Sequence, residues 1–257
     1  MRNFRKGIYL LPNLLTTGNL FSGFYAVIAA FNEDYLNAAL AILIAMAFDI
    51  LDGQTARLTK TTSRFGVEYD SISDVVSFGV APALLIFGWA LSSYGRIGWI
   101  AAFLFLVCGA LRLARFNALV GSGDSRHFIG LPIPAAAGVI ASLVVLDHHL
   151  LRLEAVKPFL ILALIYVLAF LMVSTFRYRS FKGFYLRGRK PFHVLVSAIL
   201  FLIILAAEPQ IMLFVLFTGY ALSGVIERPL ALLFRKHGIT GLQKAEPPAR
   251  DTPGSST

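Results

Sequence analysis

Residues 35–57 read YLNAALAILIAMAFDILDGQTAR, and positions 35–51 form one apolar run that polar residues interrupt only near its ends. A helix needs about 20 predominantly apolar residues, within a range of about 17–25, to cross a bilayer. The run closes on Asp49 and Asp52, and Arg57 follows. This stretch therefore predicts a transmembrane helix whose last turns bring carboxylates to the membrane surface.

Further apolar runs of comparable length flank this stretch on both sides, near residues 8–31, 73–92, 97–111, 129–147, 156–175, 192–207 and 210–233. The connections between them are short, which favours one bundle without a second domain. We therefore expect an all-α, polytopic integral membrane bundle of about eight transmembrane helices. A β-barrel is unsuitable, because its strands alternate apolar and polar residues instead of forming unbroken runs.

The composition of the whole chain agrees with this fold class. Hydrophobic residues make up 57% of the 257 positions and charged residues 14%, against about 45–50% and about 25% in soluble domains. The mean hydropathy is +0.74. These values exclude a soluble enzyme and a disordered chain, and the single cysteine, Cys108, excludes a scaffold of intrachain disulfides.

The basic residues predict the orientation of the chain. The net charge is +9, which in a membrane protein indicates cytoplasmic loops and anionic headgroups; we expect contact with the lipid bilayer and no nucleic-acid partner. With a cytoplasmic N-terminus and eight spans, only Arg96, Arg152 and Lys157 of the 23 basic residues fall outside. This predicts an inner (cytoplasmic) membrane protein with both termini inside. We expect a membrane domain at 1–236 and a disordered cytoplasmic tail at 237–257.

Four aspartates lie where two predicted spans meet the cytoplasm: Asp49, Asp52, Asp70 and Asp74. Ionisable residues in membrane segments are costly and mark functional sites. The first pair is spaced i, i+3 and the second i, i+4, so each pair shares one helix face. Because a short polar turn joins the two helices, all four carboxylates can converge at one point of the cytoplasmic face.

The negative charge of such a cluster must be compensated, because neighbouring carboxylates repel one another. Protonation, Arg57 and Arg64, or two divalent cations could compensate it; all-oxygen ligands favour Mg²⁺, Mn²⁺ or Ca²⁺. A pair of hard cations usually accompanies a phosphate substrate, whose oxygens Arg57 could bind. A structural ion-pair network and a cation-transporter site are the alternatives. A transporter more often carries its carboxylates near the midplane of repeated halves, and the aspartate segment is not repeated.

The full pattern is D-x2-D-G-x2-A-R-x8-G-x3-D-x3-D, and it is met at Asp49, Asp52, Gly53, Ala56, Arg57, Gly66, Asp70 and Asp74. Eight specified positions within 26 residues make a specific signal. The pattern resembles the signature of the CDP-alcohol phosphatidyltransferase family, and the resemblance extends over roughly residues 8–230.

The resemblance implies a polytopic membrane enzyme with a six-helix catalytic core, often a homodimer. Such an enzyme transfers a phosphatidyl group from a CDP-linked lipid to an alcohol and releases CMP. It implies two divalent cations, Mg²⁺ or Mn²⁺, held by Asp49, Asp52 and Asp70, with Asp74 completing the site and serving as general base. The residues that bind the CDP-lipid would be three small ones, Gly53, Ala56 and Gly66, together with the basic residue Arg57.

Three further stretches resemble the phosphatidylserine synthase branch of this family, at residues 74–82, 108–117 and 130–137. The substrates would then be CDP-diacylglycerol and L-serine. Arg112 and Arg115, spaced i, i+3, could clamp the serine carboxylate, or could cap the helix or hold lipid phosphate. Asn117 could contact serine or cap a turn. Glycerol 3-phosphate and inositol phosphate remain alternative acceptors.

Overall fold

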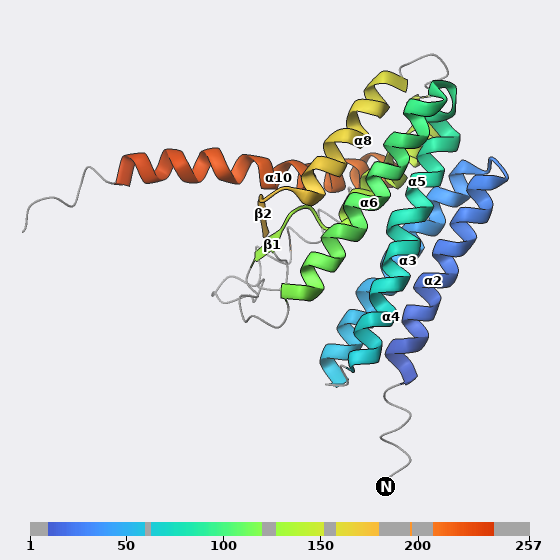
Figure 1. Cartoon of the computed structure of the whole chain (residues 1–257), viewed down its shortest axis with the longest axis horizontal. Helices are drawn as coiled ribbons and strands as arrows, with labels where there is room; N and C mark the ends of the chain where they lie inside the picture. Colours follow the sequence, from blue (N-terminus) through green and yellow to red (C-terminus); the bar gives the residue numbers. More distant parts are fainter. Residues whose placement is uncertain are drawn as a thin grey trace, which may run out of the picture.

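The computed structural model describes residues 10–59, 63–119, 127–151, 158–179, 196 and 208–238. The chain forms a bundle of long helices with one small two-stranded ribbon (Figure 1). The elements in order are α2 Leu10–Phe31, α3 Tyr35–Thr59, α4 Arg64–Asp74, η1 Val75–Val80, α5 Ala81–Ile86, η2 Phe87–Leu91, η3 Ser92–Tyr94, α6 Arg96–Leu119, β1 His127–Ile129, α7 Ile133–Leu146, η5 Asp147–Leu151, α8 Pro158–Val173, β2 Arg177–Arg179 and α10 Pro209–Gly238.

Helices α2 and α3 form a tight hairpin and pack along each other. The chain reverses at Glu33, which adopts a left-handed conformation with φ 61°. The next residue, Asp34, accepts a hydrogen bond from the backbone N–H of Asn37 at 3.3 Å. A side-chain oxygen at this position satisfies an N–H that the first helical turn leaves unpaired. The turn therefore fixes where α3 begins and leaves its other end for the aspartates.

The segment from α4 to η3 is one long helix with two wider, π-helical stretches, η1 and η2. It begins at Ser63, whose Oγ accepts a hydrogen bond from the Gly66 N–H at 3.0 Å, as an N-cap does. Pro82 offers no N–H, and its ring would crowd a carbonyl one turn earlier in a regular helix. The wider turn η1 precedes this proline and directly follows Asp74.

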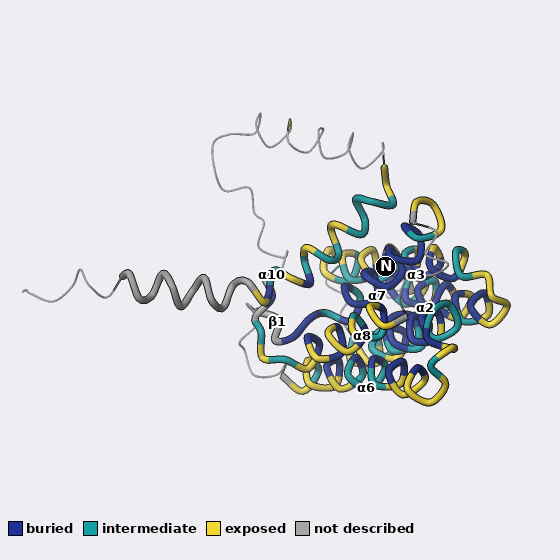
Figure 2. Tube along the Cα trace, turned by 90° about the horizontal axis from the view of Figure 1, so that it is seen from above, coloured by how far each residue is buried: buried dark blue, intermediate teal, exposed yellow. Residues whose placement is uncertain are grey.

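Helix α7 occupies the centre of the bundle. All its residues except one are buried, and it packs against α3 and α10. A helix that is apolar on every side is stable only when other helices surround it. Large apolar side chains stay exposed, such as Phe21 (70%), Phe31 (88%) and Phe103 (57%). Exposed stretches of the chain lie on the outside of the bundle (Figure 2). An outer surface of this kind suits lipid, and the chain is an integral membrane protein.

Strands β1 and β2 pair antiparallel, with Phe128 opposite Tyr178. This ribbon is the one departure from the predicted all-α class within the described residues. Tyr178 is fully buried, and its hydroxyl donates to the Ala221 carbonyl on α10 at 3.0 Å. Burial, and then the neighbouring Tyr220, raises the pKa of Tyr178 to about 12, so the phenol keeps the proton that it donates. Helix α10 runs across the other helices instead of along them (Figure 1).

The predicted spans coincide with described helices at seven of the eight positions; the span predicted at 192–207 lies outside the described residues except for position 196. Five helical segments are long and apolar enough to cross a membrane, namely Leu11–Phe31, Tyr35–Thr59, Arg64–Tyr94, Arg96–Ala118 and Ile133–Leu150. The apolar helices Phe159–Val173 and Pro209–Val225 are shorter. The all-α polytopic class is thus confirmed, and the count of eight stays a prediction. The predicted tail lies outside the described residues, apart from the end of α10.

Candidate active site

The four aspartates meet where the end of α3 faces α4. Asp52 and Asp74 are buried, with 5% and 7% of their surface exposed, while Asp49 and Asp70 are half-buried. Asp49, Asp70 and Asp74 each place one carboxylate oxygen so that the three atoms lie within 4.8 Å of one another. Oxygens that share one Mg²⁺ or Ca²⁺ lie at most about 4 to 5 Å apart, given ligand distances of about 2.0–2.6 Å. The three carboxylates are therefore spaced as ligands of a common cation.

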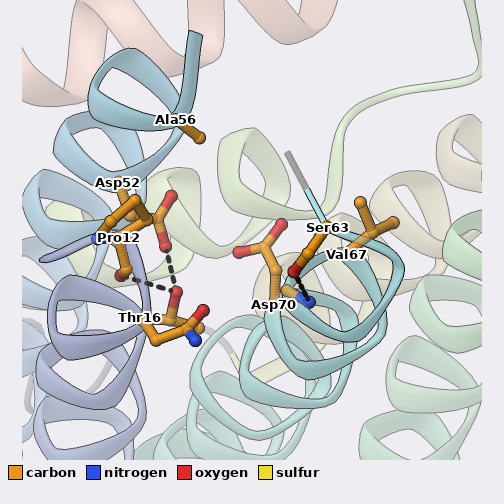
Figure 3. Close-up of a pocket in the computed structure, with 10 residues that line it drawn as sticks. Pro12, Thr16, Asp52, Ala56, Ser63, Val67 and Asp70 are labelled. Carbon is orange, nitrogen blue, oxygen red and sulfur yellow. Dashed lines mark hydrogen bonds between the residues drawn. The ribbon is translucent and has the colours of Figure 1, made fainter. Parts of the chain in front are cut away.

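Asp52 is not part of this group of three, and its carboxylate faces Asp70 across a pocket (Figure 3). The Thr16 hydroxyl of α2 donates to Asp52 Oδ2 at 2.8 Å and lies 3.1 Å from the Pro12 carbonyl oxygen. A hydrogen bond to an ionised acceptor is stronger than one between neutral groups. Helix α2, which carries no acid in its described part, therefore helps to orient the carboxylate of Asp52.

One oxygen of the cluster supports the interpretation as a cation site. Asp70 Oδ1 is buried and has no hydrogen-bond partner among the described residues. Buried polar oxygens are normally satisfied by protein or water, so an unsatisfied carboxylate oxygen beside two other carboxylates is chemically incomplete. The ligand atoms are all oxygens, which suits hard divalent cations. The residues present thus fit the divalent cations that the sequence predicts.

The pocket opens beside Asp52 and Asp70 and is lined by residues of α2, α3 and α4: Pro12, Asn13, Thr16, Asp52, Gly53, Ala56, Ser63, Gly66, Val67 and Asp70. Three of the predicted CDP-lipid-binding residues, Gly53, Ala56 and Gly66, are among them. Arg57 is exposed, but a Cβ placed on Gly53 would lie 3.6 Å from its Nη1 atom. The guanidinium group therefore lies close to Gly53, although Arg57 does not itself line the pocket.

Asn19 is a site residue that the sequence reasoning missed. Its side chain is fully buried, and its amide Nδ2 donates to Asp74 Oδ1 at 3.2 Å. Thr16 and Asn19 are spaced i, i+3 within the apolar helix α2, and both are directed at aspartates. The signal that could have found them is this recurrence of polar side chains on one face of an otherwise apolar span.

The three predicted acceptor-binding residues have different surroundings in the structure. Arg112 is buried, with 7% exposed; its guanidinium carbon lies 5.6 Å from the centre of the Phe116 ring, and its charge interacts with that of Asp74. Arg115 is exposed. Asn117 donates from its amide to Ser71 Oγ at 2.8 Å and so joins α6 to α4. Only Arg112 of the three is directed toward the aspartate cluster.

A buried cluster of carboxylates lies beside a pocket with small-residue walls, at one end of an apolar helical bundle, and such ionisable groups in a membrane protein mark a functional site. Residues 9–176 match the model of the CDP-alcohol phosphatidyltransferase family, which covers more than half of the chain. The chain belongs to this family of phosphotransferases.

Individual members of the family are similar to this chain over most of its length. The chain is 38% identical to a CDP-diacylglycerol–serine O-phosphatidyltransferase of Helicobacter pylori over 219 residues, which cover 85% of this chain and 91% of the relative. It is 37% identical to a protein of the same name from Methanocaldococcus jannaschii, over 70% of this chain and 79% of the relative. It is also 38% identical to the archaetidylserine synthase of Methanothermobacter thermautotrophicus, over 67% of this chain and 71% of the relative.

Proposed function

We propose that the protein transfers the phosphatidyl group of CDP-diacylglycerol to the hydroxyl of L-serine, with release of CMP. The observation that carries this proposal is the set of three carboxylate oxygens within 4.8 Å of one another, in a member of the CDP-alcohol phosphatidyltransferase family. The names of two relatives differ in the lipid part, phosphatidyl in one and archaetidyl in the other, but both names contain serine. Serine is therefore the acceptor that the comparisons favour.

The pocket supports a division of roles for the CDP-lipid. Gly53, Ala56 and Gly66 lack the bulk that would keep a flat cytosine ring from the backbone, and Arg57 can donate to diphosphate oxygens. Asp49, Asp52, Asp70 and Asp74 would hold two divalent cations, Mg²⁺ or Mn²⁺. When bound, these cations neutralise charge on the diphosphate and on the departing CMP. The lipid tails would reach the pocket sideways from the bilayer.

The transfer itself requires a proton acceptor and an oriented hydroxyl. We assign Asp74 as the general base: it takes the proton of the serine hydroxyl while the serine oxygen attacks the phosphorus that carries the diacylglycerol. A new P–O bond forms to serine, and the bond from this phosphorus to the oxygen retained by CMP breaks. The proton remains on Asp74 until water removes it. Such general base catalysis contributes about 10²- to 10⁴-fold.

Arg112 is the residue that best suits the acceptor. Serine carries a carboxylate, and a guanidinium group can bind it through two parallel hydrogen bonds. Arg112 is buried and within electrostatic range of Asp74, so a serine held by Arg112 would present its hydroxyl near the base. Arg115 and Asn117 would play smaller parts, since one is exposed and the other already binds Ser71.

The orientation and assembly are part of the proposal. We place the aspartate cluster and both termini in the cytoplasm, because 20 of the 23 basic residues then lie on that side. Residues 1–236 would form the membrane domain, residues 237–257 a cytoplasmic tail, and two copies a homodimer. Labelling of single introduced cysteines from either side of sealed vesicles would test the orientation.

The reaction can be tested with purified protein in detergent or nanodiscs. CDP-diacylglycerol, Mn²⁺ or Mg²⁺, and one acceptor at a time are supplied, and CMP is measured. We expect CMP with L-serine and a phosphatidylserine product. Release with glycerol 3-phosphate or inositol phosphate instead would reassign the acceptor. No CMP with any acceptor from a folded sample would contradict the transferase proposal and favour a cation-transporter role for the aspartates.

A further inference from the structure

Helix α2 is fixed against the helix that carries Asp74 by contacts on both sides of this aspartate. Ser73 Oγ donates to the Thr16 carbonyl at 3.3 Å, and Ser77 Oγ donates to the Asn19 carbonyl at 3.0 Å. Both serines are fully buried. One turn further along α2, a Cβ on Gly23 would collide with Ser77. These contacts set the position of α2 along its neighbour.

In this register the Asn19 amide faces Asp74. Its Nδ2 donates to Asp74 Oδ1 at 3.2 Å, which leaves the second carboxylate oxygen, Oδ2, for other partners. An amide is neutral and cannot accept the proton that a general base receives. It can therefore hold one carboxylate oxygen without competing for the proton. A lysine or arginine in its place would also cancel part of the negative charge of the cluster, which an amide does not.

The Asn19 amide is only half satisfied. Asn19 is fully buried, and its Oδ1 has no hydrogen-bond partner among the described residues. An apolar side chain of the same shape would avoid the cost of this unpaired oxygen, but it would leave Asp74 Oδ1 without its donor. Leucine is close to asparagine in shape and is common in this helix. A buried polar group left unsatisfied beside a reacting group is typical of a functional role.

We infer that Asn19 is a positioning residue for Asp74: its amide holds Oδ1 so that Oδ2 faces the incoming hydroxyl of serine. This inference rests on the proposed function. Residues that orient a reacting or ligating group through one hydrogen bond contribute about 10- to 100-fold to activity. The contribution arises in the transition state, because the carboxylate must be aligned when the proton moves.

The test replaces Asn19 with leucine, which removes the amide and keeps the shape. For Asn19→Leu we expect kcat and kcat/KM for serine to fall by the same factor, about 10- to 100-fold. The Tm alone does not separate the two roles, because leucine removes both the unpaired Oδ1 and the donor to Asp74. Mn²⁺ should raise the Tm of the variant as it does for the wild type. A purely structural role for Asn19 would leave kcat of the folded fraction close to the wild-type value.

Two further variants make the result decisive. Asn19→Ala removes the amide donor without adding a charge, so it should lose kcat as the leucine variant does, and it decides the matter if leucine prevents folding. The matched control is Asn37→Leu at the opposite end of α3, where Asn37 Nδ2 donates to Asp34 Oδ2 at 2.7 Å. This pair is exposed and distant from the cluster, so kcat should stay at the wild-type value.

A double-mutant cycle tests whether Asn19 acts through Asp74. Asp74→Glu displaces the carboxylate, so Asn19→Leu in that background should reduce the remaining activity by less than about threefold, which is the signature of coupled residues. Full additivity of the two losses overturns the inference. Wild-type kcat in Asn19→Leu also overturns it and leaves the proposed function intact. A folded wild type that releases no CMP with any acceptor overturns both.

Discussion

The Thr16 hydroxyl on α2 donates a hydrogen bond of 2.8 Å to Asp52 Oδ2 on α3, and both side chains are buried. This contact joins two helices at the level of the pocket. It supplies a donor to the carboxylate of Asp52, which faces Asp70 across the pocket. The geometry of the acidic cluster therefore depends on a helix that carries no carboxylate in its described part.

Removal of this donor should weaken the site without dismantling it. For Thr16→Val we expect turnover to fall by about tenfold or more, with a higher Mn²⁺ concentration needed for half-maximal activity, because Asp52 loses a donor that orients it. The matched control is Thr17→Val at the next position, where the exposed hydroxyl donates to the Asn13 carbonyl and lies 3.0 Å from the Tyr69 hydroxyl, with no hydrogen bond to a described aspartate. Equal activity of both variants would show that the bond to Asp52 is dispensable.

Substitution of Asp70 should remove Mn²⁺ binding and turnover, whereas substitution of Asp74 should remove turnover alone. Asp70→Asn takes a carboxylate with a buried, unpaired oxygen out of the cluster, so Mn²⁺ should no longer stabilise the protein and turnover should be abolished. Asp74→Asn keeps a side-chain oxygen that can still ligate a cation, so it should retain binding of Mn²⁺ and CDP-diacylglycerol but lose turnover by about 10²- to 10⁴-fold. Thermal shift with Mn²⁺ and with CDP-diacylglycerol, measured beside CMP release, separates the two. Full activity of Asp74→Asn would contradict its assignment as the base.

The two arginines of α6 should differ in their effect on serine. Arg112 is buried near Asp74, whereas Arg115 is exposed. A hydrogen-bonded pair with a charged group contributes about 1.5–3 kcal/mol, which corresponds to about 10- to 100-fold in affinity. We expect Arg112→Ala to raise the KM for serine by this factor and Arg115→Ala to raise it much less. Steady-state kinetics at fixed CDP-diacylglycerol measure both; unchanged serine kinetics in Arg112→Ala would remove the clamp.

The sequence predicted those features that depend on local periodicity. Unbroken apolar runs of about the length of a bilayer crossing favour helices, because a helix pairs every backbone group within its own segment. The i, i+3 and i, i+4 spacings placed the aspartates on facing surfaces, and the structure brings Asp49, Asp70 and Asp74 together. The acidic cluster was predictable because each pair lies within one helix and a short connection separates the two helices.

The features that the sequence did not predict depend on contacts between distant segments. Asn19 meets Asp74 across 55 positions; the polar face that it shares with Thr16 marks it as a candidate but does not say which residue it contacts. Arg112 and Arg115 share a helix face closely enough that spacing alone assigned them one role. The rotation of α6 against its neighbours, which tertiary packing sets, decides which of them is buried. The ribbon of β1 and β2 likewise joins segments about 50 positions apart through only three residues each.

Two glycines of α10 provide a matched test of how this helix is attached to the bundle. A Cβ on Gly224 would collide with the buried ring of Tyr178, whereas a Cβ on Gly219 would meet no atom within 4 Å. Alanine in a helix interior is favoured over glycine by about 0.5–1 kcal/mol, so Gly219→Ala should raise the Tm slightly. Overpacking costs about 1–3 kcal/mol, so Gly224→Ala should lower the Tm.

The same pair of variants also reports on the site. Tyr220 lies next to the Tyr178 ring, with centroids 5.6 Å apart, and interacts electrostatically with Arg112. If α10 shifts in Gly224→Ala, the surroundings of Arg112 change, and the KM for serine should rise while the KM for CDP-diacylglycerol stays constant. Gly219→Ala should keep both values. A lower Tm without any change in serine KM would show that α10 stabilises the bundle independently of the acceptor site.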